Sequence, residues 1–234
     1  MRSHQRALAK LTLSLRVTGV RADGYHLLDA EMATIDLADT LSFEEGDGLD
    51  EVVVRGAVLP PDDLVARALR AVGRPARVVL DKRIPVGAGL GGGSADAAAV
   101  LRWAGCDEVG VAVGLGADVP FCLVGGRARV RGVGEVVEPL PYVEATYTLL
   151  TPPFRVSTPA VYRAWDDLGG PAAEGPNDLE PAALVVEPRL AAWRDRLGDA
   201  TGLVPVLAGS GGTWFVAGAH PGVAGGVVAR TDRP

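Results

Sequence analysis

The chain has 234 residues, of which 48% are hydrophobic and 22% charged, the balance of a globular protein with a substantial core. Its formal net charge of −6 excludes the overall positive charge of a nucleic-acid-binding protein. The two cysteines, Cys106 and Cys122, are too few for a disulfide framework. No stretch reaches the ~18 apolar residues of a membrane span, so we expect a cytoplasmic protein with neither a nucleic-acid nor a membrane partner.

The first predicted element is a strand. Residues 9–17 alternate apolar and polar side chains, which predicts a half-buried strand with Lys10, Thr12 and Ser14 on one face. A turn-rich loop at 18–24 follows. On these residues alone, Lys10 is equally well a solvated cation at the edge of a strand.

Lysine is rare in this chain. Of its 23 basic residues only Lys10 and Lys82 are lysine, and the others are arginine. Because lysine carries a compact ammonium and arginine a broad planar fork, the two are not interchangeable. Two positions can arise by chance, but they can also mark sites where a compact cation is required.

The next elements are short. Residues 31–37, 41–44 and 52–54 have the composition of strands, with Asp and Gly turns between them. Residues 62–72 are predicted to form an amphipathic helix with acidic residues in its first turn. Residues 77–80 are predicted to form a strand.

A glycine-rich stretch then precedes an alanine-rich helix. Glycine reaches positive φ and lets backbone N–H groups crowd around one point, and alanine is the strongest helix former. A loop of this kind that feeds a helix N-terminus suits a phosphate group. Ser94 either caps the helix or contacts a phosphate or Mg²⁺. The predicted nucleotide loop consists of Pro85, Val86, Gly87, Ala88, Gly89, Leu90, Gly91, Gly92, Gly93, Ser94 and Ala95.

Other glycine motifs fit this stretch less well. A Walker loop ends in Gly-Lys-Ser/Thr, and no lysine follows this loop. The spacing of Gly87, Gly89 and Gly92 fits the dinucleotide fingerprint, but that fingerprint follows its strand immediately, whereas charged residues and Pro85 intervene here. A flexible linker remains the alternative without a ligand.

The second conspicuous stretch is 114–121, Gly-Leu-Gly-Ala-Asp-Val-Pro-Phe. Asp118 is either the cap of a following turn or a carboxylate that accepts or orients a proton. Residues 125–135 are predicted to form a strand and a turn.

The composition shifts around 139–141, which predicts domains at 1–140 and 141–234. Tyr162 follows Pro159 on a predicted helix, where it is a core tyrosine or a stacking residue. A second helix is expected within 188–197. The segment 206–215 is predicted to form two strands joined by a turn at Gly209, Ser210 and Gly211, and 221–229 is short for a closing helix.

These motifs resemble the GHMP kinase superfamily. The strings 82–98 and 114–121 are the specific ones, and at least five blocks over nearly the whole chain stand in the family's order. Ala-Lys-x-x-Leu-x-Leu at 9–15 and Arg-Ala-Asp-Gly-Tyr-His at 21–26 belong to the same pattern. The resemblance is closest to the branch that phosphorylates a cytidine-diphosphate-linked methylerythritol in the non-mevalonate isoprenoid pathway.

The resemblance implies a fold and a reaction. The fold is an α+β, two-domain GHMP kinase fold, with an N-terminal domain like domain 2 of ribosomal protein S5 and a smaller ferredoxin-like C-terminal domain. The reaction transfers a phosphoryl group from ATP, with Mg²⁺, to the 2-hydroxyl of the small-molecule substrate. The motifs assign neither the metal ligands nor an oligomeric state, monomer or dimer.

The resemblance also implies residue roles. Lys10 and Asp118 are catalytic, and the loop at 85–95 binds ATP. Tyr25 and Tyr162 sandwich the cytosine and His26 hydrogen-bonds it. Thr12 stands where the family usually has asparagine; its hydroxyl still reaches phosphate but offers one donor instead of two. The remaining implied substrate contacts are Gly209, Ser210 and Gly211.

Three alternatives remain open at this point. A different GHMP kinase would keep the ATP loop but lack the Tyr25–His26 pair. A non-catalytic nucleotide-binding paralogue is suggested by Thr12 and by the short segments at 104–113 and at the C-terminus. A structural protein that binds no nucleotide does not account for five ordered motif blocks.

Overall fold

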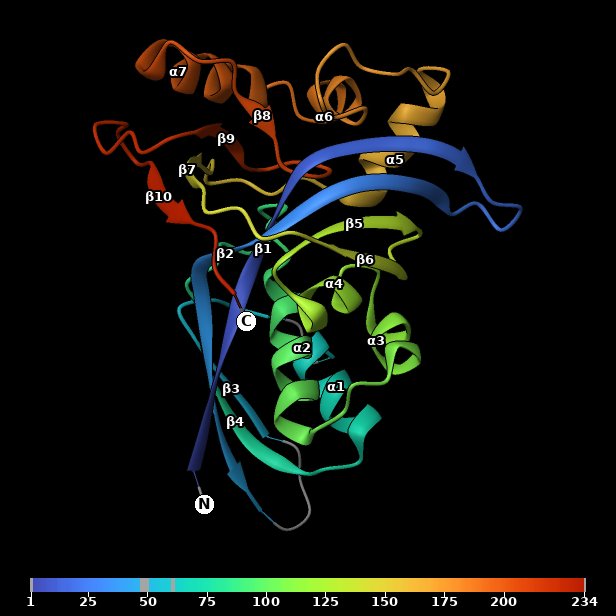
Figure 1. Ribbon diagram of the computed structural model, residues 1–234, viewed down its shortest axis with the longest axis vertical. Coiled ribbons are helices and arrows are strands. Elements are labelled where there is room, and N and C mark those ends of the chain that lie inside the picture. Colours follow the sequence, from blue (N-terminus) through green and yellow to red (C-terminus); the bar gives the residue numbers. More distant parts are fainter. Residues whose placement is uncertain (1, 47–50, 60–61, 234) are drawn as a thin grey trace.

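Two long strands run through the middle of the molecule (Figure 1). β1 (Arg2–Val20) and β2 (His26–Glu45) form an antiparallel hairpin in a computed structural model that describes residues 2–46, 51–59 and 62–233. Their pairing shifts register between Leu8 and Lys10 and again further along, and such bulges bend and twist a strand pair. The predicted strand at 9–17 is therefore the central part of a longer one.

β2 has different neighbours at its two ends. β5 (Arg127–Gly132) pairs with residues 28–33 of β2, and β4 (Ala76–Asp81) pairs with residues 40–45. β3 (Glu51–Arg55) adds to β4 in parallel, and β6 (Val136–Leu140) adds to β5. Residues 34–39 of β2 thus lie between the stretch that pairs with β5 and the stretch that pairs with β4. Lys10 of β1 pairs with Thr34 at the start of this stretch.

The prediction of separate strands at 31–37 and 41–44 was wrong, because β2 is continuous across them. Asp39 occurs where a turn was expected, but its side chain is fully buried. Its carboxylate accepts hydrogen bonds from the backbone N–H groups of Arg83 and Ile84. Because these hydrogen bonds satisfy the buried carboxylate, Asp39 is accommodated within a strand and β2 continues past it.

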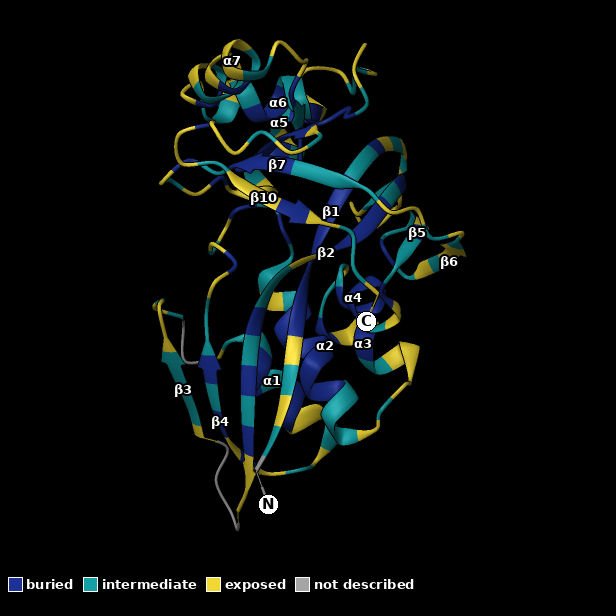
Figure 2. Cartoon of the chain, turned by 60° about the vertical axis from the view of Figure 1, so that its left-hand side comes forward, coloured by how far each residue is buried: buried dark blue, intermediate teal, exposed yellow. Residues whose placement is uncertain are grey.

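Four helices cover one face of this sheet (Figure 1). They are α1 (Leu64–Val72), α2 (Gly92–Ala104), α3 (Val109–Leu115) and α4 (Val119–Val124). The α2 residues 95–101 are all buried, because this helix lies between the sheet and the other helices (Figure 2). Its alanines let the helix approach its neighbours closely.

The two predicted helix starts need correction. α1 begins at Leu64, and Asp63 caps it by accepting a hydrogen bond from the backbone N–H of Ala66, so the acidic residues precede the first turn. α2 begins at Gly92, and Gly91 occupies the cap position with φ 66°. Ser94 lies inside the helix and its side chain makes no capping hydrogen bond, which leaves its hydroxyl available.

A second, four-stranded antiparallel sheet has the order β10-β7-β9-β8. Its strands are β7 (Thr146–Leu150), β8 (Val206–Leu207), β9 (Trp214–Ala217) and β10 (Val227–Arg230), and it packs with α5 (Thr158–Asp167), α6 (Glu180–Val186) and α7 (Leu190–Thr201). Residues 221–229, which are short for a closing helix, form no helix and lead into strand β10. The helix expected within 188–197 is α7.

The first sheet ends at Leu140 and the second begins at Thr146. The chain also crosses back between them, because Ile35 of β2 forms a bridge with Thr231 and Leu15 of β1 forms one with Asn177. Division into domains at 140/141 stays a prediction. In the part of the chain that the structure describes, no helix has the length and apolar character to cross a membrane.

Candidate active site

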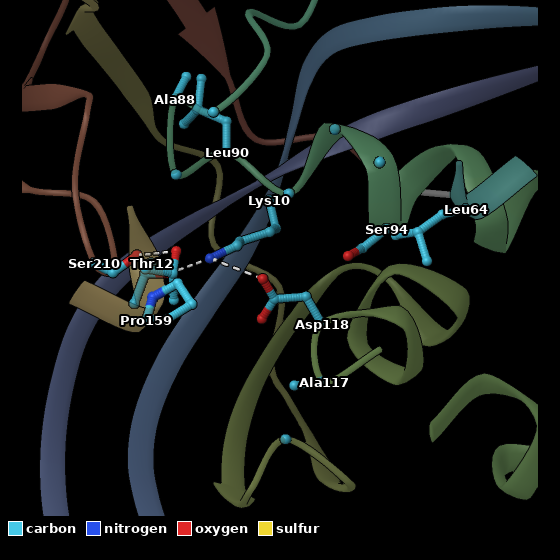
Figure 3. A pocket seen from close by; sticks show the side chains of 18 of the residues that line it. Lys10, Thr12, Leu64, Ala88, Leu90, Ser94, Ala117, Asp118, Pro159 and Ser210 are labelled. Atoms are coloured by element: carbon cyan, nitrogen blue, oxygen red, sulfur yellow. Dashed lines mark hydrogen bonds and ion pairs between the residues drawn. The ribbon is translucent and has the colours of Figure 1, made fainter. Parts of the chain in front are cut away.

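A cavity of about 900 Å³ opens where the two sheets meet. Its wall includes the segment 85–93, hereafter the glycine loop, together with Lys10, Asp118 and the aromatic side chains of His26 and Tyr162. The bends of β1 and β2 place residues from both sheets around one space. Figure 3 shows the end of this cavity that contains Lys10 and Asp118.

Lys10 is buried at the centre of this end of the cavity. Its Nζ lies 3.0 Å from Thr12 Oγ1 and 3.4 Å from Asp118 Oδ2 (Figure 3), and its backbone N–H donates to Leu90 O of the glycine loop at 3.1 Å. The lysine stem runs close beneath the loop, since a Cβ at Gly91 would lie 2.7 Å from Lys10 Cγ. Only glycine leaves room for it there.

Asp118 occupies the cap position of α4 but does not cap the helix. Its carboxylate turns to Lys10 instead, and with 34% of the side chain exposed it remains accessible from the cavity. The pair can therefore offer a negative oxygen and a positive nitrogen to one reacting group.

The glycine loop presents its backbone to the same space. Gly87, Gly89 and Gly91 have φ values of 75°, 76° and 66°, which side chains other than glycine rarely adopt. α2 follows directly, and its first residues, Gly92, Gly93 and Ser94, line the cavity. The N–H groups of a helix's first turn have no partner within the helix, and the positive end of the helix dipole lies there. The Ser94 hydroxyl points towards the space beside Asp118 (Figure 3).

The loop at 208–212, hereafter the second glycine loop, packs on the first one through backbone atoms. Thr213 N donates to Ala88 O at 3.0 Å. A Cβ at Gly89 would lie 2.6 Å from Ala208 O, and one at Gly212 would lie 2.9 Å from Ala88 C. No side chain fits between the two loops, so the second sheet is held directly against the glycine loop.

Aromatic and polar groups line the other end of the cavity. The rings of His26 and Tyr162 lie 4.7 Å apart, centroid to centroid, and His26 Nε2 lies 2.8 Å from Asp166 Oδ1. Burial, and secondly the charge of Asp118, raise the pKa of Tyr162, so its phenol stays protonated. Tyr25 is 62% exposed at the rim and its ring lies beside the guanidinium of Arg21.

Nearly all of the residues predicted for the site line this one cavity, but two do not. Ala95 is buried in α2, and Gly211 faces Leu207 and Ala183 in the second sheet's core. Ser210 does reach the cavity, where its hydroxyl bonds that of Thr158 at 2.7 Å. The remaining predicted residues of the wall are Thr12, Tyr25, Pro85, Val86, Gly87, Ala88, Gly89, Leu90, Gly91, Gly92, Gly93, Ser94 and Gly209.

Comparison with known proteins shows which family has a similar sequence. Residues 63–106 match the family described as GHMP kinases N terminal domain. A 4-diphosphocytidyl-2-C-methyl-D-erythritol kinase of Paracoccus denitrificans is 40% identical over 231 residues, covering 89% of this chain and 84% of that protein. One of Pelotomaculum thermopropionicum is 41% identical, covering 89% and 86%.

The chain belongs to the 4-diphosphocytidyl-2-C-methyl-D-erythritol kinase family. A crystal structure of 4-(cytidine 5'-diphospho)-2C-methyl-D-erythritol kinase superposes with a TM-score of 0.80 at 34% identity, covering 98% of this chain and all of that one. The mevalonate kinase of Methanococcus jannaschii, at 12% identity and a TM-score of 0.60, shares the fold. The predicted α+β GHMP kinase fold is confirmed.

Sequence reasoning missed several polar residues of this family member's site. Lys82 lies under the glycine loop between the carboxylates of Asp39 and Asp96, and Asp166 holds the ring of His26. The rarity of lysine was the available signal for Lys82. Asp39 and Asp166 gave no comparable signal, because their partners are 43 and 140 residues away in the sequence.

Proposed function

We propose that this chain transfers the γ-phosphoryl group of ATP to the 2-hydroxyl of 4-diphosphocytidyl-2-C-methyl-D-erythritol. The observation that carries the proposal is the Lys10–Asp118 pair, 3.4 Å apart beside the glycine loop and in one cavity with the His26–Tyr162 aromatic pair. A phosphate site, an acid–base pair and a base-sized aromatic pocket together match the two substrates.

The nucleotide phosphates bind to the backbone of the glycine loop and the start of α2. Free N–H groups and the helix dipole favour negative charge there without a cluster of cationic side chains, which agrees with a net charge of −6. Mg²⁺, when bound with ATP, neutralises charge on the phosphates. Ser94 and Asp118, whose side-chain oxygens line the cavity beside the glycine loop, would hold it together with the phosphates.

Among the described residues, no group of three or more His, Cys, Asp or Glu side chains can hold a metal ion unaided. That donor set fits a cation that arrives with the nucleotide rather than one held in a protein cage. In the proposed reaction Mg²⁺ enters the site bound to ATP.

Asp118 accepts the proton of the attacking hydroxyl. Lys10 stabilises charge on the phosphoryl group as it moves, while the Thr12 hydroxyl accepts a hydrogen bond from Lys10 and fixes the direction of its ammonium. Thr12 can therefore orient Lys10 although its side chain lacks the second donor hydrogen of an asparagine. Catalysis rests on positioning and charge stabilisation.

The cytosine binds at the aromatic end. His26 uses Nε2 for its hydrogen bond with Asp166, so the other ring nitrogen, Nδ1, is left for a hydrogen bond with the cytosine. Tyr162 and the exposed Tyr25 supply aromatic faces for stacking, each worth about 1–3 kcal/mol in nucleic-acid-binding proteins. Closure of Tyr25 over the base would complete the sandwich.

The test is ADP release from the purified protein with Mg-ATP, with and without the diphosphocytidyl substrate. We expect substrate-dependent ADP that disappears in Lys10→Ala and Asp118→Ala, with ATP affinity of Asp118→Ala within about threefold, since its role is in the transition state. Asp107→Ala, an exposed carboxylate outside this cavity, is the matched control and should keep full activity.

Other outcomes point to other functions. ATP binding without ADP in any assay would make the chain a non-catalytic nucleotide-binding paralogue. ADP release that other small alcohols stimulate more than the diphosphocytidyl substrate would indicate a different GHMP kinase. Loss of ATP binding in Asp118→Ala would give that residue a structural role.

A further inference from the structure

Three charged side chains are buried together under the glycine loop. Lys82, Asp39 and Asp96 have only 3%, 0% and 1% of their side chains exposed. Lys82 Nζ donates to Asp39 Oδ2 and, at 2.7 Å, to Asp96 Oδ2. Buried charges are costly unless they are paired in good geometry, so a cluster at this place calls for a reason.

The cluster joins both ends of the glycine loop to the sheet. Asp39 of β2 accepts hydrogen bonds through Oδ1 from the backbone N–H groups of Arg83, at 2.5 Å, and Ile84, at 2.8 Å, just before the loop. Asp96 lies near the start of α2, just after the loop. The Lys82 ammonium connects the two carboxylates, so β2, the start of the loop and the helix behind it share one cation.

A compact cation fits this position. A Cβ at Gly92 would lie 3.2 Å from Lys82 Nζ and 3.0 Å from Ile84 Cγ2, so the loop passes directly over the ammonium. A guanidinium is broader and planar. In a chain with 21 arginines and two lysines, both lysines lie beneath the same loop.

Lys82 has partners on both sides, whereas Asp96, within the part of the chain that the structure describes, has a partner on one oxygen only. Burial lowers the pKa of Lys82, but the charges and hydrogen bonds of Asp96 and Asp39 outweigh it and the net change is upward. Among the described residues, Asp96 Oδ1 has no hydrogen-bond partner although it is buried. Asp96 is therefore held in place through its one bond with Lys82.

We propose that Lys82, together with Asp39 and Asp96, forms a brace that positions the glycine loop for the phosphates of the nucleotide. Lys82 is a positioning residue in this role and takes no part in phosphoryl transfer. The inference rests on the proposed function for the identity of the ligand, but the state of the loop itself is measurable without any ligand.

The test compares Asp96→Ala with two matched variants. Asp96→Ala cuts the connection to α2 while leaving Lys82 and Asp39 as a balanced pair, so the fold is retained. Asp96→Asn keeps an oxygen that accepts from Lys82 and should restore the brace. Leu101→Ala removes a buried side chain on the same helix and destabilises the domain without touching the loop.

Two readouts are made on each purified protein. The first is hydrogen exchange of the glycine-loop amides without nucleotide, which should be faster in Asp96→Ala than in the other two variants. The second is affinity for ATP and for inorganic tripolyphosphate. Both should weaken about tenfold or more in Asp96→Ala, because a loop that is competent in one molecule out of ten binds about tenfold less tightly.

Unchanged loop exchange in Asp96→Ala would overturn the proposal. So would a loss confined to ATP, because Asp96 would then be a direct contact of the nucleoside. Lys82→Arg tests the same cation, and we expect it to resemble Asp96→Ala; wild-type exchange and affinity in Lys82→Arg would contradict the requirement for a compact ammonium. If wild-type protein binds neither ligand, the proposed function fails while the exchange comparison still decides the brace.

Discussion

At the scale of single residues, Asp96 is a buried carboxyl group beside both a cation and a second carboxylate. Burial raises its pKa to about 7, against an ordinary value of 3.8; the Lys82 ammonium lowers it in part and the Asp39 carboxylate raises it. Asp96 thus holds its proton to higher pH in the folded chain than in the unfolded chain. Its contribution to the free energy of unfolding is greatest below pH 4 and falls as the pH rises towards 7.

Asp96→Asn should remove this pH dependence. We expect the free energy of unfolding of Asp96→Asn, relative to wild type, to increase between pH 4 and pH 8 by on the order of 1–3 kcal/mol, since only wild type must ionise a buried carboxyl group. Urea titrations at several pH values measure the difference. A difference that stays constant or decreases with pH would show that Asp96 is ionised in the folded chain throughout.

The site residues divide into those that the sequence could indicate and those that it could not. Lys10 and Asp118 each stand in a motif whose residue types match a chemical task, and the structure places them 3.4 Å apart. Asp39 reads as a turn residue in isolation. Its role depends on contacts with Lys82 and the backbone of Ile84, which only the folded sheet brings near.

At the scale of elements, the turn between β5 and β6 supports Asp118. Gly134 has φ 119°, and a Cβ there would lie 2.2 Å from Ala117 O, directly before Asp118. Glu135 holds the turn by accepting a hydrogen bond from the backbone N–H of Val133 at 2.6 Å. The stretch 125–135 therefore has a second task besides ending the sheet, which is to support the backbone of the carboxylate.

Gly134→Ala should displace Asp118. Because a misplacement of about 1 Å can cost about a hundredfold in rate, we expect kcat to fall at least about tenfold with nucleotide affinity nearly unchanged. Gly126→Ala is the control, since Gly126 also has positive φ, 75°, but a Cβ there meets nothing within 4 Å. Equal losses of kcat in Gly134→Ala and Gly126→Ala would show that backbone strain, and not the contact with Ala117, causes the loss.

Elements were predicted well where local composition determines them and poorly where tertiary contacts do. The strand at 77–80 and the helix after the glycine loop follow from local composition, and the structure has both. The joining of 31–37 with 41–44 into one strand does not, because the pattern is broken at Asp39 by a buried charge. Strand β10 likewise depends on its partner β7.

At the scale of the whole molecule, the cavity is shared by both sheets, so a ligand there should stabilise the entire chain. ATP at a hundredfold excess over its dissociation constant adds about 2.7 kcal/mol to the free energy of unfolding, which for a chain of this size corresponds to a rise in Tm of about 5–10 °C. Differential scanning calorimetry with Mg-ATP measures it. AMP at the same concentration is the control and should raise Tm less. An equal rise in Tm would show that the β- and γ-phosphates contribute little to binding.

The two glycine loops meet through backbone atoms, with Gly89 against Ala208 and Gly212 against Ala88. Main-chain atoms are the same in every protein, so this contact carries no side-chain code that relatives would have to match. We therefore expect this contact to survive in a chimaeric kinase that takes its C-terminal half from another family member, provided that both donors keep glycine at these two positions and the Arg16–Asp178 ion pair between the halves is kept.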